Sequence, residues 1–215
     1  MKVYKDKINI LVSKNSWFEI YAVKLKKKLQ KDFRVRIIYN QQDIRKSLIN
    51  FILSFNEKIT KKNLNKNKFN IVVHESNLPE GRGFSPMSWQ ILNGKKIIPI
   101  VLFQADENID TGKIFLRDKI KLSGNELSDE WRRMQGDKTI ELCTTFVKKM
   151  NKIRAIKQSN KKASHYPRRT KKDSSLDINK SIKEQFNLLR IVDNSKYPAF
   201  FEYKKNKYRL KIEKI

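Results

Sequence analysis

Residues 70–112 organise the rest of the chain, and they read NIVVHESNLPEGRGFSPMSWQILNGKKIIPIVLFQADENIDTG. They open with an apolar, β-branched run, Ile71–Val73, which is typical of a buried strand and delivers His74. A turn-rich segment with a proline and two glycines follows, then a short helical run, a second apolar strand and Asp110. A histidine at the end of a buried strand, with an acidic loop downstream, is a candidate for chemistry. The alternative, which periodicity alone favours, is a core histidine satisfied by a backbone carbonyl.

Short apolar strands alternate with helical patterns along the chain. Strands are expected at residues 8–12, 34–39, 50–54, 71–73 and 113–120. Ser16 and Glu19 have the spacing of a capping box, which predicts that a helix begins at Ser16, and a short helix is expected over 43–47. This alternation predicts an α/β protein with a mostly parallel sheet and helices on both faces.

Two more helices are predicted after the last of these strands. Ser123 and Glu126 repeat the capping-box spacing, so a helix is expected over residues 127–134. Gly136-Asp137 is expected to end that helix, and a second one follows as far as Met150.

The chain is expected to divide into three parts. Residues 1–150 form the predicted main domain, and residues 151–163 are basic and almost without core residues, which indicates a linker. Residues 164–215 form a small C-terminal region, with a helix predicted over 178–191 and a β-hairpin over 202–212.

The chain is strongly basic, with 49 Lys and Arg against 22 Asp and Glu and a formal net charge of +27. Such a charge favours anionic partners, which include nucleic acid, phosphorylated metabolites and acidic membrane surfaces. Lysine dominates over arginine, and Asn and Ile are frequent, as in proteins encoded by AT-rich genes. Most of the lysines are therefore interpreted as a solvated surface.

The remaining composition excludes several classes of protein. The single cysteine, Cys143, excludes an internal disulfide framework and a thiolate metal cluster, and no other group of residues has metal-ligand spacing. No span reaches the about 18 apolar residues of a transmembrane helix, and the charged N-terminal residues are unlike a secretory signal. We expect a cytoplasmic protein without a metal and without a membrane partner.

Two features at predicted strand ends are candidates for function. His74 and Asp110 follow separate strands, and a histidine held by a carboxylate is a general base poised near neutral pH. The turn Ser13–Ser16 also follows a strand, at a helix N-terminus where backbone N–H groups favour a phosphate. This second signal is weak because no glycine-rich fingerprint accompanies it. A Ser-His-Asp hydrolase is poorly supported, since no serine stands in a nucleophile-elbow context.

At several motifs together, the chain resembles the catalytic domain of folate-dependent N-formyltransferases. The motifs are His74–Pro79 (HESNLP), Arg82-Gly83, Ser85-Pro86, Trp89, Leu102-Phe103 and Ile109–Gly112 (IDTG). In that family a histidine opens an H-x-S-x-L-P segment, R-G-x-x-P follows, and an aspartate lies in a D-T-G or D-S-G turn. The resemblance covers roughly the first two thirds of the chain and implies a Rossmann-like fold.

The C-terminal region resembles that of formyltransferases acting on nucleotide-linked amino sugars, and includes Tyr166–Thr170 (YPRRT) and Tyr197–Phe201 (YPAFF). Within these it is most similar to a subgroup that includes enzymes of the pseudaminic-acid pathway. The resemblance implies formyl transfer from N10-formyltetrahydrofolate to the primary amine of a UDP- or dTDP-linked amino-dideoxy sugar, in lipopolysaccharide or surface-glycan biosynthesis. The implied partners are folate and a nucleotide sugar, without nucleic acid, and the apolar tail is compatible with a homodimer through the C-terminal region.

The same resemblance assigns roles to residues. It implies that His74 is the general base, that Asp110 orients it, and that the pterin lies against one loop. The residues of that loop are Ala105, Asp106, Glu107, Asn108 and Asp110. Much of the family carries an oxyanion-donating asparagine two residues before the histidine, where this chain has Val72. Losing one such donor typically costs ~10²–10³ in rate, so a substitute is expected, with Asn77, Ser76 or a backbone N–H as candidates.

A third set of residues is expected to hold the nucleotide sugar. Its members are Ser13, Asn15, Ser16, Trp17, Arg168, Tyr197 and Phe201. Arginine pairs with phosphates through two parallel hydrogen bonds, and aromatic rings stack on bases. The alternatives are a surface ion pair for the arginine and core packing or a dimer interface for the aromatic residues.

Two other functions are weighed against the sugar-nucleotide enzyme. A methionyl-tRNA formyltransferase would share the catalytic pattern and suit the basic charge, but the region after Ala163 is expected to be too small for the C-terminal β-barrel of those enzymes. A catalytically inactive relative is the third hypothesis, and Val72 is its motivation.

Overall fold

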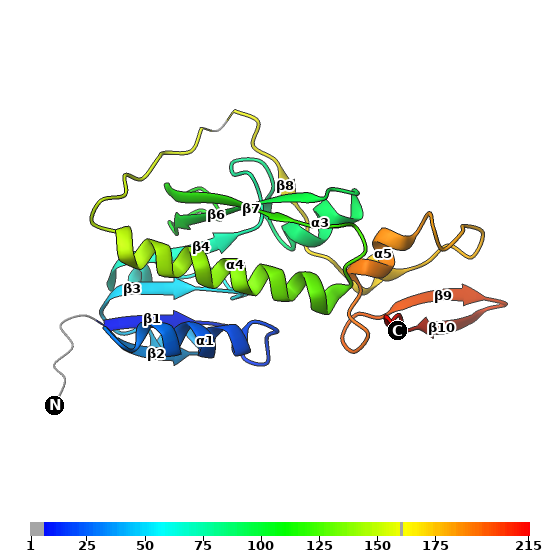
Figure 1. Ribbon diagram of the computed structural model, residues 1–215, viewed down its shortest axis with the longest axis horizontal. Helices are drawn as coiled ribbons and strands as arrows, with labels where there is room; N and C mark the ends of the chain where they lie inside the picture. Colours follow the sequence, from blue (N-terminus) through cyan, green and yellow to red (C-terminus); the bar gives the residue numbers. More distant parts are fainter. Residues whose placement is uncertain (1–6, 160) are drawn as a thin grey trace.

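The computed structural model describes residues 7–159 and 161–215, and a six-stranded sheet lies at its centre (Figure 1). From edge to edge, the strands are β2 (Arg34–Ile38), β1 (Lys7–Leu11), β3 (Ser47–Ile52), β4 (Asn67–His74), β6 (Ile97–Gln104) and β7 (Ile114–Lys121). The first four are parallel, whereas β6 is antiparallel to both β4 and β7. The prediction of a mostly parallel α/β sheet is confirmed.

Helices cover the two faces of this sheet unequally. On one face α1 (Glu19–Leu29), α3 (Pro86–Leu92) and α4 (Ser128–Lys149) enclose the main core. The other face is covered by a 3-10 turn at Gln41–Asp43, the short α2 (Lys61–Leu64) and the loop that carries Leu78. The candidate site lies at the carboxyl ends of β1, β3 and β4.

The helix α4 is continuous where the sequence predicted two helices. It runs unbroken through Gly136-Asp137, so the predicted break is wrong. The reason is packing: a Cβ at Gly136 would lie 2.4 Å from ring atoms of Tyr21 on α1. The glycine marks the point where the two helices approach closely, and not the end of a helix.

Two other predicted helices are shorter than expected. The helix α1 begins at Glu19 and not at Ser16, whose hydroxyl instead accepts a hydrogen bond from the N–H of Phe18. The carboxylate of Glu19 accepts from the N–H of Asn15, so the paired residues stabilise the turn before the helix. The short helix expected over 43–47 is the 3-10 turn, because residue 47 already belongs to β3.

The C-terminal region consists of α5 (Phe186–Ile191) and the hairpin β9 (Ala199–Tyr203) and β10 (Asn206–Leu210). The helix predicted over 178–191 forms only in its last part. The hairpin begins earlier than predicted, and its turn residues Lys204 and Lys205 have φ values of 46° and 65°. Two successive left-handed residues match the twist of the strands they connect.

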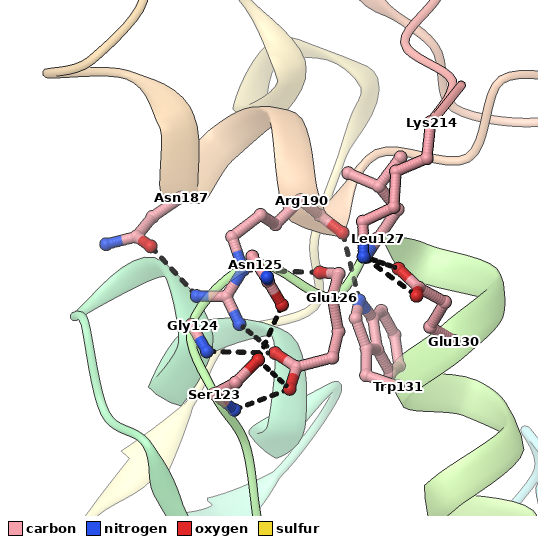
Figure 2. Close-up of polar contacts among 10 residues, drawn as sticks. All are labelled: Ser123, Gly124, Asn125, Glu126, Leu127, Glu130, Trp131, Asn187, Arg190 and Lys214. Carbon is pink, nitrogen blue, oxygen red and sulfur yellow. Dashed lines mark hydrogen bonds and ion pairs between the residues drawn. The ribbon is translucent and has the colours of Figure 1, made fainter.

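A buried ion pair fastens this region to α4 and its preceding loop (Figure 2). Arg190 is 2% exposed, and its Nη2 lies 3.1 Å from Oε2 of Glu126 while its Nε donates to the Glu126 carbonyl oxygen. The carbonyl of Arg190 accepts from the indole of Trp131. Burial raises the pKa of Glu126, but hydrogen bonds from Ser123 and Gly124 outweigh it and lower that pKa to about 2.

The segment predicted as a linker lies against the main sheet. Ile156 forms a bridge with Ile114 on β7, and a two-residue strand β8 (His165–Tyr166) pairs in parallel with β5 (Arg82–Gly83). The chain therefore returns to the loop that follows His74. Among the described residues, no helix is both long enough and apolar enough to cross a membrane.

Candidate active site

His74 is the last residue of β4 and is 6% exposed. Its Nε2 lies 2.8 Å from the carbonyl oxygen of Gly81 and 3.7 Å from Oδ2 of Asp110. Both oxygens are acceptors, so in the neutral imidazole the proton is assigned to Nε2 and the lone pair to Nδ1. The two interpretations of His74 are therefore compatible: a backbone carbonyl accepts its hydrogen bond, and a carboxylate lies beside it.

Asp110 is held beside His74 by its backbone conformation and by one further hydrogen bond. Its φ of 57° places it in the left-handed region, which turns its side chain back toward β4. The N–H of Gly83 donates to Oδ2 of Asp110 over 2.8 Å. Gly112 completes the turn, because a Cβ there would lie 1.7 Å from the carbonyl oxygen of Gln104.

The pair opens onto a cleft of about 600 Å³ at the carboxyl ends of the parallel strands. In open α/β sheets this is where ligands bind. One wall is the loop after β6, and from that loop Ala105, Asp106, Asn108 and Asp110 line the cleft. Val72 and Phe103 add apolar surface below it. A flat heterocycle with polar edges fits such a wall.

The other wall combines the turn after β1 with the C-terminal region. Six of the seven residues expected to bind the nucleotide sugar line it: Ser13, Asn15, Ser16, Trp17, Arg168 and Tyr197. The two segments also touch, because Nζ of Lys196 donates to the Asn15 carbonyl oxygen over 2.7 Å. Arg168 lies 4.3 Å from the centroid of the Phe84 ring.

Three predicted site residues lie outside the cleft. Asn77 is exposed, and its amide oxygen accepts from Nη1 of Arg117 over 2.9 Å, so the structure does not place it as an oxyanion donor. Glu107 pairs with Lys61 over 2.7 Å on the outer side of its loop. Phe201 stacks on Tyr208 within the hairpin. These side chains share a segment with the site, but they point elsewhere.

Sequence reasoning missed several residues that line the cleft. They are Glu75, Arg132, Gln135 and Lys196. Burial raises the pKa of the Glu75 carboxyl, against the opposing effects of His74 and of a hydrogen bond with Gln135. Gln135 comes from the middle of α4, and no local pattern pairs it with a strand-end residue. The described residues contain no cluster of three or more His, Cys, Asp or Glu that could hold a metal ion.

A mostly parallel sheet with a histidine–aspartate pair beside the end of β4 is the arrangement that the resemblance to folate-dependent N-formyltransferases implies. Residues 49–139 match the family described as formyl transferase. This matched stretch contains both His74 and Asp110.

Relatives and solved structures agree on this domain. A methionyl-tRNA formyltransferase of Thermodesulfovibrio yellowstonii is 30% identical over 145 residues, which are 67% of this chain and 46% of that protein. The structure of a methionyl-tRNA formyltransferase from Clostridium thermocellum superposes with a TM-score of 0.81 at 24% identity, over 97% of this chain and 93% of that one. A 4-N formyltransferase from Francisella tularensis gives 0.76 at 20% identity, over 99% and 100%. The chain spans about half the length of the curated relatives it matches.

Proposed function

We propose that the protein transfers a formyl group from N10-formyltetrahydrofolate to the primary amine of a nucleotide-linked amino sugar. The observation that carries the proposal is the His74–Asp110 pair, which lies at the junction of two different walls of one cleft. A two-substrate transfer needs this arrangement, because the donor and the acceptor must reach the same general base from separate sides.

The chemistry follows from the tautomer of His74. The amine nitrogen of the acceptor bonds to the formyl carbon, the bond from that carbon to N10 of the folate breaks, and N10 takes up a proton. Nδ1 of His74 has the free lone pair that accepts the proton lost by the amine. The Asp110 carboxylate, 3.7 Å from Nε2, stabilises the imidazolium that results.

The folate is assigned to the wall formed by Val72, Phe103, Ala105, Asp106 and Asn108. When bound there, it supplies the activated formyl group. Apolar side chains line the base of this wall, and a carboxylate and a carboxamide lie at its rim. The pterin has a flat ring with donors and acceptors along its edge, so the residues present fit it.

The acceptor is assigned to the wall that Arg168, Arg169 and Lys196 make basic and that Trp17 and Tyr197 make aromatic. The pKa of Arg169 is lowered by burial, Asp173 opposes this, and the nearby positive charge of Arg132 lowers it further. The neighbouring guanidinium groups of Arg132 and Arg169 favour an anion between them. A nucleoside diphosphate would supply the charge and a base for stacking.

Methionyl-tRNA formylation is the second candidate, and the names of the curated relatives favour it. The net charge of +27 also suits a polyanion. Chain length does not separate the two candidates, since this chain matches 93% of the solved methionyl-tRNA formyltransferase chain. We prefer a sugar nucleotide because the C-terminal region lines one wall of the cleft. The cleft that remains has the size of a small molecule.

One experiment decides between the candidates. The protein is incubated with N10-formyltetrahydrofolate and, in separate reactions, with UDP- and dTDP-linked amino sugars or with charged initiator tRNA. Mass spectrometry then detects the acceptor in which a formyl group replaces one amine hydrogen. We expect a formylated sugar nucleotide. A formylated methionyl-tRNA with no sugar product overturns the proposal in favour of the second candidate, and no product with either acceptor overturns both.

A further inference from the structure

The side chain of Gln158 makes three hydrogen bonds, all to groups around the turn that carries Asp110. Its Nε2 donates to the carbonyl oxygens of Asp110 over 2.9 Å and of Gly112 over 2.8 Å. Its Oε1 accepts from Nη2 of Arg82 over 3.1 Å. Gln158 lies in the segment that was expected to be a linker, beyond the residues that match the family.

The orientation of the Gln158 amide follows from its partners. An arginine only donates, so the amide oxygen must face Arg82, and the two carbonyl oxygens only accept, so the NH₂ group must face the turn. Arg82 is 6% exposed, and no carboxylate pairs with it within the described residues. Gln158 thus binds one nitrogen of a buried cation on one side and two backbone acceptors on the other.

The turn needs such support because Asp110 has the left-handed φ of 57°. A non-glycine residue in that region is strained, and it persists only where the surroundings hold it. The described contacts hold the turn from both sides, since the N–H of Gly83 binds the Asp110 carboxylate and Gln158 binds the carbonyl of the same residue.

These contacts form a closed ring around the site. Arg82 precedes Gly83 in β5, so the residue that binds Gln158 adjoins the residue that binds the carboxylate. The N–H of Arg82 in turn donates to the carbonyl of Ser164, which continues the segment of Gln158. A shift of Gln158 would therefore move the Asp110 carboxylate relative to Nε2 of His74.

We infer that Gln158 is a positioning residue for the reaction: by donating to the carbonyls of Asp110 and Gly112, it fixes the carboxylate of Asp110 beside His74. The inference rests on the proposed function only for its kinetic consequence. The structural consequence, an ordered 110–112 turn, is measurable without any substrate.

The test separates the hydrogen bond that the Gln158 amide oxygen accepts from those that its NH₂ group donates. Gln158→Glu has the same shape and keeps an acceptor for Arg82, but it cannot donate to two carbonyl oxygens. Gln158→Ala removes both sides. Ser159→Ala is the matched control, because Ser159 is the exposed neighbour whose hydroxyl bonds only within its own segment, to the N–H of Lys161.

With the full-length protein, we expect kcat to fall about 10- to 100-fold in Gln158→Glu and in Gln158→Ala, with KM for the folate within a few fold of wild type. Amide hydrogen exchange at Gly83 should be faster in both variants, and Ser159→Ala should match wild type. In an Asp110→Asn background, Gln158→Ala should lower kcat no further, because residues that act through one group are non-additive.

Different failures have different meanings. If Gln158→Glu keeps wild-type turnover and wild-type exchange at Gly83 while Gln158→Ala loses both, Gln158 serves only to satisfy Arg82 and the inference is overturned. An additive effect in the Asp110→Asn background also overturns it. If the wild-type protein formylates no acceptor, the proposed function fails, and exchange at Gly83 still decides the structural inference.

Discussion

Oδ2 of Asp110 lies 3.7 Å from Nε2 of His74, and the N–H of Gly83 holds the same oxygen over 2.8 Å. The two residues belong to neighbouring antiparallel strands or their loops. His74 is the last residue of β4, and Asp110 lies in the loop that follows β6. In the proposed reaction, a carboxylate in this position would keep the Nε2 proton in place and leave Nδ1 to act as the base.

Replacing Asp110 with asparagine should lower kcat by about 10²–10⁴, because the charge that stabilises the protonated imidazole is lost while the shape is retained. Turnover is measured by mass spectrometry of the formylated acceptor, and cooperative thermal unfolding verifies the fold. Glu80→Gln is the control, since Glu80 is an exposed acid on the neighbouring loop. Near-wild-type turnover in Asp110→Asn would contradict the assignment.

Asn77→Ala should leave kcat within about twofold of wild type. Its side chain is exposed and binds Arg117, so it does not reach the cleft where an oxyanion would form. Steady-state rates at saturating folate and acceptor measure this. A fall of ten-fold or more in kcat with KM unchanged would restore Asn77 as the substitute for the donor that is missing at Val72.

Arg190→Met should lower the free energy of unfolding by about 3–5 kcal/mol, because it leaves the buried Glu126 carboxylate without its partner. Urea denaturation followed by circular dichroism measures the change. Lys207→Met is the matched control: its ion pair with Glu202 is more than half exposed on both sides and should contribute less than about 1 kcal/mol. Equal effects of the two substitutions would show that the buried pair does not anchor the C-terminal region.

Glu126 should also contribute to acid unfolding. Its pKa in the folded protein is about 2, below the ordinary value of 4.5, so its stabilising effect is fully present above pH 4.5. That effect is lost as the pH falls from 4.5 through 2, where the folded protein also takes up the proton. The difference in unfolding free energy between wild type and Glu126→Gln should therefore shrink over this window. A difference that stays constant from pH 7 to pH 2 would contradict the lowered pKa.

Gly136→Ala should destabilise the protein by about 1–3 kcal/mol, although alanine is the better helix former. The added Cβ would lie 2.4 Å from the Tyr21 ring and would push α1 away from α4. Urea denaturation measures this, and the double variant with Tyr21→Ala provides the control. In the Tyr21→Ala background, where no ring opposes the Cβ, Gly136→Ala should be neutral or stabilising. A loss of stability in that background would exclude the ring contact as the cause.

Local signals in the sequence were sufficient for the strands and for the two central residues of the site. Apolar, β-branched runs marked the central strands of the sheet, because strands that are buried on both faces are rich in such residues. His74 and Asp110 could be singled out because both follow such runs. Because β6 is antiparallel to β4, however, it is the loop after β6, and not the strand end itself, that brings Asp110 back to His74.

Tertiary structure alone decided the rest. Gly136 indicates a helix break in the sequence, but the helix continues because a tyrosine from another helix needs the space of the missing side chain. Residues 151–163 look like a linker because they contain few apolar side chains, yet Gln158 binds the turn that holds Asp110. Such contacts join residues far apart in the chain through single hydrogen bonds or single close approaches. They produce no periodicity in the sequence, and only the folded arrangement brings their partners together.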